Sequence, residues 1–255
     1  MKFKLYIVLV LLLVIPNKIF PQTNSIFNDY HKLSFQFGAS RYTGSETSTI
    51  PSTLKYKFRD FTSPHFGFYY DLLQTDNFNF KLGFSTLLVR DWEEYGIKAE
   101  EIPSVDSSRD FYVEGAGSWR FNLPLTTEYL IDLGKNKLFI SSSLIIGYSK
   151  EYGNTVAQYG IKAPNESEFT TIDRVYRRQT APWYANVQFG VGMYFPFEKW
   201  MLRTNVYYNF ALQDLYNGTF LFSNLEQSPD TSGNFSFRGD SFGIEFSVYL
   251  KKKKK

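Results

Sequence analysis

The stretch that decides the fold reads Trp119-Arg-Phe-Asn-Leu-Pro-Leu-Thr-Thr-Glu-Tyr-Leu-Ile-Asp-Leu133. Its odd-numbered positions are almost all apolar, whereas its even-numbered positions include Arg120, Glu128 and Asp132. A period of two over about a dozen residues suits a tilted, membrane-crossing β-strand, because one face meets lipid and the other meets the barrel interior. This stretch therefore predicts one strand of a transmembrane β-barrel.

The same alternation recurs along the rest of the chain. The expected strands are Leu33–Arg41, Phe66–Leu73, Phe78–Trp92, Trp119–Leu133, Leu138–Tyr148, Trp183–Phe195, Trp200–Ala211 and Ser241–Leu250. The connections between them are alternately long and short, which is typical of bacterial barrels with short periplasmic turns. We therefore expect an all-β fold, an eight-stranded antiparallel transmembrane β-barrel with long outer loops and short periplasmic turns. Both mature termini would lie in the periplasm.

The composition favours a barrel over a bundle of membrane helices. Aromatic residues make up 19% of the chain, with 26 Phe and 19 Tyr, yet the mean hydropathy is only -0.29. A soluble sandwich or lipocalin-like barrel is an alternative, but its apolar face would point inward. Phe and Trp are too bulky for an eight-stranded lumen, whereas the opposite face is rich in Gly, Ser and Asn. The four tryptophans fall on the apolar face of their predicted strands and are expected at the membrane interfaces: Trp92, Trp119, Trp183 and Trp200.

The N-terminus predicts export. Lys2 and Lys4 precede an apolar run from Leu5 to Ile15, so residues 1–22 are expected to be a signal peptide. Residues 23–250 would form the barrel domain, and Lys251–Lys255 a lysine tail. The sequence contains no Cys, which excludes disulfides, thiolate metal sites and a cysteine nucleophile.

The charge balance suggests no nucleic-acid partner. The chain has 28 basic and 25 acidic residues, and removal of Lys2, Lys4 and Lys18 with the signal peptide leaves 25 of each. The expected partners are outer-membrane lipid and, through the loops, an envelope protein or a glycan. We expect a monomer without a cofactor.

Six charged residues fall on the inward-facing parity: Asp71, Lys81, Arg120, Glu128, Arg203 and Glu245. Asp71 can meet Lys81 on a neighbouring strand, and Arg203 can meet Glu245. We interpret them as an ion-pair network that plugs the lumen, since a charge in so narrow a space must be paired. The alternative is a selectivity lining for a narrow pore.

No pattern predicts a catalytic, cofactor-binding or metal site. His31 and His65 are the two histidines, and they are expected at opposite ends of the barrel. His65 with Ser63 could imitate the rim site of a lipid-modifying enzyme, but no spacing motif supports this, and an interfacial structural role is favoured. The second long loop is acidic but lacks EF-hand spacing: Glu93, Glu94, Glu100, Glu101, Asp106, Asp110 and Glu114. The third loop carries basic residues that suggest contact with lipopolysaccharide phosphates or an acidic glycan: Arg174, Arg177 and Arg178.

Residues 121–130 also carry a family resemblance. The run Phe-Asn-Leu-Pro-Leu-Thr-Thr-Glu-Tyr-Leu resembles a ϕ-x-ϕ-P-ϕ-ϕ-x-x-Tyr strand of PorT-like outer-membrane β-barrel proteins of Bacteroidetes. The resemblance implies a small barrel and adds a role in protein secretion, although most members of the family have no assigned activity. The chain departs from the usual terminal aromatic residue of barrels, because Tyr249 and Leu250 are followed by five lysines.

The sequence therefore predicts a non-enzymatic outer-membrane barrel that anchors four contact loops. These loops are Thr43–Ser63, Glu93–Gly117, Lys150–Ala181 and Gln213–Arg238. The alternatives are the lipid-modifying enzyme with His65 at its outer rim and the narrow pore.

Overall fold

The structure is a computed structural model. It describes residues 26–43, 45–48, 54–58, 60–89, 92–97, 109–114, 118–149, 153–162, 169–179, 182–223, 225 and 228–253. Within 45–58, 92–114 and 153–179 it defines the strand path and register only. The expected signal peptide, residues 1–22, lies outside the described residues. In the part of the chain that is described, no helix has the length and hydropathy needed to cross a membrane.

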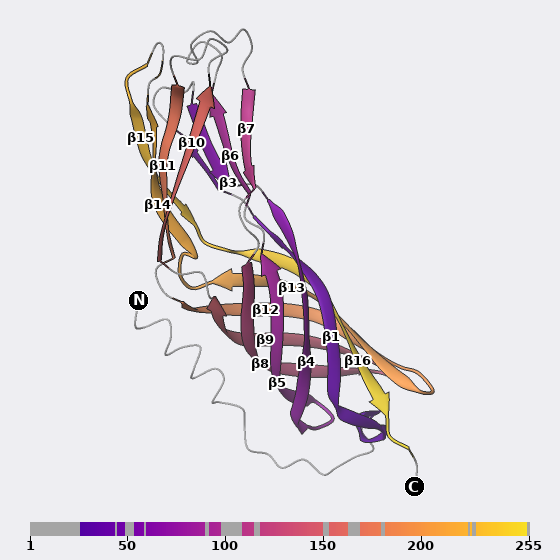
Figure 1. The fold of residues 1–255 in the computed structure, drawn as a ribbon. Coiled ribbons are helices and arrows are strands. Elements are labelled where there is room, and N and C mark those ends of the chain that lie inside the picture. The colour runs from indigo at the N-terminus through magenta and orange to yellow at the C-terminus, as the bar shows by residue number, and fades with distance from the viewer. Residues whose placement is uncertain are drawn as a thin grey trace.

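Eight long antiparallel strands close into a barrel, as the alternation predicted (Figure 1). Around the barrel they follow the order β1-β16-β13-β12-β9-β8-β5-β4. Their bounds are β1 Tyr30–Tyr42, β4 Phe61–Gln74, β5 Phe78–Val89, β8 Ser118–Leu133, β9 Asn136–Ser149, β12 Trp183–Pro196, β13 Trp200–Ala211 and β16 Ser241–Lys251. First and last strands pair, so Phe37 lies opposite Phe246 and the sheet has no free edge.

The barrel is inside-out relative to a soluble protein. Outward-facing aromatic side chains are exposed, for example Phe35 at 59% and Trp183 at 57%, whereas the inward-facing Ser34 and Glu128 are fully buried. Such an exterior is stable only against lipid, because each exposed ring would otherwise lie in water. The expected transmembrane barrel is therefore confirmed, and the soluble alternative, with its apolar face inward, is wrong.

The eight expected strands correspond to the eight barrel strands, and their apolar side chains point outward as predicted. The differences concern where the strands begin and end. The second begins at Phe61 rather than Phe66, since the alternation continues toward the N-terminus through buried Ser63 and His65. The third ends at Val89, and Trp92 begins a separate strand outside the barrel. The other three tryptophans are exposed on the barrel exterior, as expected: Trp119, Trp183 and Trp200.

The three short connections, the first described residues and the last described residues lie at one end of the barrel, here called the short-turn end, and the four long connections lie at the long-loop end (Figure 1). A four-residue 3-10 turn, η1 Ile26–Asp29, precedes β1 at the short-turn end. There the backbone N–H of Lys252 donates to the carbonyl of Asp29 at 2.8 Å. The first described residues and the start of the lysine tail are thus held together.

The four long connections are not irregular loops, which corrects the sequence-based expectation. Two of them contribute the sheet β2-β3-β6-β7, and the other two the sheet β10-β11-β14-β15. The strands are β2 Ser45–Ser48, β3 Leu54–Phe58, β6 Trp92–Ile97, β7 Arg109–Glu114, β10 Gly153–Lys162, β11 Phe169–Gln179, β14 Tyr216–Ser223 and β15 Thr231–Phe237. Each long connection is a β-hairpin that continues two barrel strands. The two sheets, together called the extension, rise from the long-loop end and contact each other at β15 and β2 (Figure 1).

Apolar side chains point in opposite directions in the barrel and in the extension. In β14 and β15, the rings of Phe220, Phe222 and Phe235 are buried, while Ser232 and Asn234 are exposed. Apolar side chains therefore point outward in the barrel and inward in the extension. Water outside the extension and lipid outside the barrel account for both arrangements.

Close backbone approach in the barrel wall depends on glycine. The ring of Tyr184 on β12 lies directly over Gly147 on β9, its register partner, where any Cβ would collide with the ring. The Tyr184 hydroxyl donates to Asn122 Oδ1 at 2.6 Å and so fixes the ring across the lumen. The small residues of the inward face thus leave room for large tyrosine rings from the next strand.

Candidate functional site in the barrel lumen

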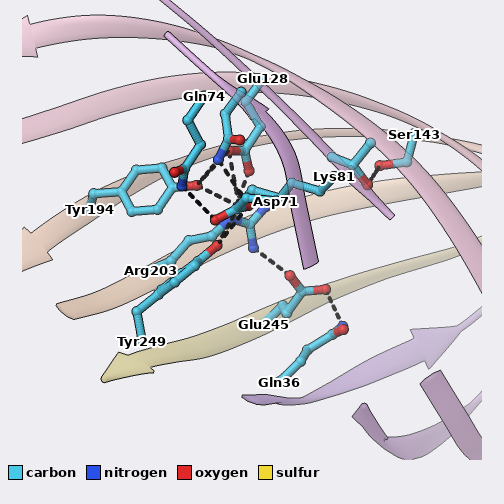
Figure 2. A network of polar contacts seen from close by, with 12 residues as sticks. Gln36, Asp71, Gln74, Lys81, Glu128, Ser143, Tyr194, Arg203, Glu245 and Tyr249 are labelled. Carbon is cyan, nitrogen blue, oxygen red and sulfur yellow. Dashed lines mark hydrogen bonds and ion pairs between the residues drawn. The ribbon is translucent and has the colours of Figure 1, made fainter. Parts of the chain in front are cut away.

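The lumen near the short-turn end contains a cluster of five charged side chains. These residues, here called the charge cluster, are Asp71 on β4, Lys81 on β5, Glu128 on β8, Arg203 on β13 and Glu245 on β16 (Figure 2). None is more than 2% exposed. Each occupies a position of its strand whose side chain points into the lumen. Because side chains alternate between the two faces of a strand, all five point into the same space.

Glu128 is the centre of the charge cluster. Its Oε1 accepts from Arg203 Nε at 2.7 Å. Its Oε2 accepts from the Tyr194 hydroxyl at 2.5 Å and forms an ion pair with Lys81 Nζ at 3.1 Å. Figure 2 shows Lys81, Tyr194 and Arg203 close to Glu128. One carboxylate therefore joins both cations.

The other two carboxylates lie at the edges of the charge cluster. Glu245 pairs with the second arm of Arg203, and its Oε2 accepts from Gln36 Nε2 at 2.5 Å. Asp71 is 3.9 Å from Lys81 Nζ and accepts from Gln74 Nε2 at 2.7 Å. Asp71 thus has a weaker ionic contact than Glu128, although both are fully buried.

Aromatic rings surround the two cations. The guanidinium carbon of Arg203 lies 4.5 Å from the ring centroid of Phe139, and Lys81 Nζ lies 5.0 Å from that of Tyr194. Lys81 Nζ also donates to the Tyr249 hydroxyl at 2.9 Å. Buried charges are tolerated when each is paired and hydrogen-bonded, and these contacts meet that condition.

An apolar layer closes the lumen beyond the charge cluster. Phe27 of η1 enters the short-turn end and meets Tyr194 edge-on, with ring centroids 4.9 Å apart. Both rings belong to a buried group with Tyr30, Leu130, Phe139, Met201 and Tyr249. This layer separates the charge cluster from the solvent at the short-turn end.

A polar cavity of about 50 Å³ lies between the charge cluster and the long-loop end. This volume has room for about three to five water molecules. Hydroxyl, amide and imidazole groups from seven of the eight barrel strands line it, β9 contributes Ile145, and Glu245 is the formally charged carboxylate. The lining includes Gln36, His65, Asn186, Tyr207, Asn209 and Glu245.

A second aromatic group, the aromatic cap, covers the cavity at the long-loop end. It consists of Tyr42 and Phe61 from the barrel and Tyr216 and Phe237 from the extension. Tyr42 stacks on Phe61 at 4.7 Å, and Phe237 lies 5.9 Å from Phe61 and 6.1 Å from Tyr216. The extension thus helps to close the lumen that its strands continue.

The two predicted ion pairs, Asp71 with Lys81 and Arg203 with Glu245, are confirmed. Arg120 is buried as expected but lies near the aromatic cap, where it donates to the Tyr216 hydroxyl. It is therefore not part of the charge cluster.

The expectation for His65 at the interface is wrong. The side chain is 5% exposed and lines the cavity, with its ring centroid 6.2 Å from that of Tyr207. The Ser63 hydroxyl donates to the Leu88 carbonyl at 2.6 Å, so it is directed toward the backbone of β5. His31 is exposed at the beginning of β1, at the other end of the barrel, as expected.

Several sequence-based candidates fall where side chains are not described. Glu93, Glu94, Asp110 and Glu114 lie in β6 and β7, and Arg174, Arg177 and Arg178 lie in β11. Glu100, Glu101 and Asp106 are outside the described residues, as are Lys254 and Lys255 of the tail. Among the residues whose surroundings are described, no group of three or more His, Cys, Asp or Glu is arranged to hold a metal ion.

Sequence reasoning missed the central role of Glu128 and the tyrosines around it. Neighbouring-strand pairing was the available signal, but Glu128 and Arg203 lie on strands that are not adjacent. Tyr194 and Tyr249 have inward parity in β12 and β16, so the alternation itself could have located them.

Comparisons with known proteins find similarity in structure alone. No family model matches the sequence, and no curated protein matches it. The chain is similar to the outer membrane protein OprG from Pseudomonas aeruginosa, at 10% identity and a TM-score of 0.44, over 88% of this chain and 98% of that one. It is also similar to Neisserial surface protein A, at 12% identity and a TM-score of 0.33, over 87% of this chain and 97% of that one. A third is the outer membrane protease OmpT from Escherichia coli, at 9% identity and a TM-score of 0.32, over 87% and 94%. Likeness of this size says nothing about activity or ligand.

Proposed function

We propose that this protein is a non-enzymatic outer-membrane anchor that presents its extension to a protein or glycan of the cell envelope. The observation that carries this proposal is the reversal of side-chain facing. Phe35 faces lipid in the barrel, whereas Ser232 and Asn234 face outward in the extension beside buried Phe235. A β-structure with its own apolar interior and a polar exterior is suited to contacts in water.

The filled lumen supports an anchor over a narrow pore. The apolar layer around Phe27, the charge cluster and the aromatic cap occupy successive levels of the barrel. Eight-stranded barrels have interiors just wide enough for side chains, and here the side chains are large and mutually bonded. We expect the protein to be silent in planar-bilayer conductance measurements.

The surroundings of His65 support the non-enzymatic reading. A nucleophile and its base should lie within hydrogen-bond reach, but the Ser63 hydroxyl donates to a backbone carbonyl. His65 lies in the lumen beneath the aromatic cap rather than at a rim open to lipid. The His65→Ala variant is therefore expected to retain function.

The cellular setting is part of the proposal. A signal peptide over residues 1–22 would deliver the chain to the outer membrane, with the short-turn end in the periplasm and the extension outside. The resemblance of residues 121–130 to PorT-like proteins makes an accessory role in secretion the first process to investigate. The monomeric state and the absence of a cofactor belong to the same proposal.

Site-specific photo-crosslinking in cells tests the contact surface. A photoreactive residue replaces Ser232, Asn234 or Ser236, which are exposed on β15. Matched positions at Phe35 and Phe66, both exposed on the barrel exterior, should reach lipid only. The proposal predicts discrete protein or glycan adducts from the β15 positions and none from the barrel positions.

Two results would contradict the proposal. Protein adducts from Phe35 and Phe66 with none from β15 would place the contact surface on the barrel wall. Loss of cellular function in His65→Ala, in protein that still shows a heat-modifiable gel shift, would favour the enzyme hypothesis over the anchor.

A further inference from the structure

The lining of the lumenal cavity contains an acidic side chain but no strongly basic one among the described residues. Its lining contains one carboxylate, Glu245, and neither Lys nor Arg among the described residues. His65 is the remaining titratable nitrogen base in the lining. Most of the other groups are amides and hydroxyls, which offer oxygen atoms as acceptors. The cavity is therefore better suited to a positive than to a negative guest.

Three buried amide side chains of the lining have an oxygen without a hydrogen-bond partner. They are Gln36 Oε1, Asn186 Oδ1 and Asn209 Oδ1, in residues that are 6%, 7% and 6% exposed. The orientation of Gln36 is fixed, because its Nε2 donates to Glu245 and a flipped amide would set oxygen against carboxylate. Unpaired buried acceptors are costly, so these oxygens call for a donor or a cation.

The adjoining charge cluster has an independent need for positive charge. It contains three carboxylates, Asp71, Glu128 and Glu245, against two cations, Lys81 and Arg203. With every group ionised, the formal charge is negative by one. These residues are buried, so their charges are weakly screened and a nearby cation would be attracted strongly. Glu245 connects this surplus to the cavity, because it belongs to both.

We propose that the cavity binds one small monovalent cation, either an alkali ion or an ammonium-type ion, among the amide oxygens near Glu245. A divalent ion is disfavoured because Glu245 is already paired with Arg203, whereas Ca²⁺ and Mg²⁺ sites usually use several carboxylates or waters. The cavity has room for only a few water molecules, so a small ion fits it best. The ion would neutralise the surplus charge and satisfy the unpaired oxygens at once.

The test uses the full chain refolded in detergent micelles. Thermal unfolding is followed by far-UV circular dichroism at constant ionic strength, set with tetramethylammonium chloride, which has no N–H donor and whose four methyl groups keep its charge away from amide oxygens. Sodium chloride or methylammonium chloride then replaces it in steps, which distinguishes the two sources of positive charge. The proposal predicts a saturable rise in the unfolding temperature with at least one of them, because the ligand binds the folded state.

Two variants and a matched control locate the site. Gln36→Leu and Asn209→Leu each remove an amide oxygen and should weaken the apparent cation affinity by about tenfold or more. Ser143→Ala is the control, since Ser143 is buried in the lumen, bonds to Thr126 and does not line the cavity. It should titrate like the parent protein.

A measurement on the unmodified protein keeps the proposal testable if a variant fails to fold. Sodium-23 NMR should show line broadening by the refolded barrel, reversed by the cation that competes best. If the unfolding temperature depends on ionic strength alone and the sodium line is unaffected, the cavity holds water only and the proposal is wrong. Unchanged titrations in both leucine variants would place any bound cation elsewhere and would equally overturn it.

Discussion

Replacing Glu128 by Gln should be far more destabilising than replacing Asp71 by Asn, although each substitution removes one buried negative charge. Glu128 contacts Arg203 at 2.7 Å and Lys81 at 3.1 Å, and it accepts from Tyr194 at 2.5 Å. The glutamine amide keeps the shape and one acceptor oxygen, but its NH₂ group would face a cation.

The size of the effect follows from these contacts. A hydrogen bond to a charged group contributes about 1.5–3 kcal/mol, and breaking a buried ion pair costs about 3–5 kcal/mol. We therefore expect Glu128→Gln to lower the free energy of unfolding by about 3–5 kcal/mol. Asp71 lies 3.9 Å from Lys81, beyond hydrogen-bond distance, and it accepts from the neutral amides of Gln74 at 2.7 Å and Asn79 at 3.2 Å. Asp71→Asn should cost only about 1 kcal/mol.

The assay is equilibrium unfolding in urea of protein refolded into lipid vesicles, monitored by tryptophan fluorescence. Trp119, Trp183 and Trp200 report on both ends of the barrel exterior. Because both variants change the formal charge equally, the difference between them isolates contact geometry from charge count. Equal costs for the two variants, or a larger cost for Asp71→Asn, would refute the assignment of Glu128 as the centre of the charge cluster.

Two further substitutions test the barrel wall and its surroundings. Gly147→Ala should destabilise the barrel by about 1–3 kcal/mol in the same urea assay, because its methyl group enters the Tyr184 ring, and the cost should shrink in a Tyr184→Ala background. Phe35→Lys should cost about 2–4 kcal/mol if Phe35 lies near the bilayer midplane, whereas Ser232→Lys in the extension should be nearly neutral. An equal cost for the two lysine substitutions would contradict the assigned boundary between lipid and water.

The barrel could be predicted from sequence because its signal is local. Each strand carries a long period-two pattern, and Trp119–Leu133 alone shows which face is apolar. The extension was not predicted because four of its strands, β2, β3, β6 and β7, have only four to six residues. In β15, two Ser, one Thr and one Asn among seven residues further weaken the strand pattern. Such a segment is predicted as a loop from its sequence, because its strand structure depends on pairing with neighbouring strands.

The interior could be predicted only in part. The alternation shows which side chains point into the lumen, but not how far along the barrel axis they lie or which side chains they meet on non-adjacent strands. The parity of Asp71 and Lys81 on neighbouring strands located their pair correctly. Glu128 meets Arg203 across the barrel, and that contact depends on closure of the whole sheet. The sequence predicts a rim position for His65 because the alternation is clear only from Phe66, whereas the strand begins five residues earlier at Phe61.

Apolar side chains point outward in β16 and inward in β15. This change also fixes the position of the protein along the membrane normal. Sinking would carry the Ser232 and Asn234 face into hydrocarbon, and rising would lift Phe242 and Ile244 into water. The cost of taking polar side chains out of water opposes the first displacement, and the hydrophobic effect opposes the second. The extension therefore stands at a set distance above the bilayer, and any partner it meets must reach to that height.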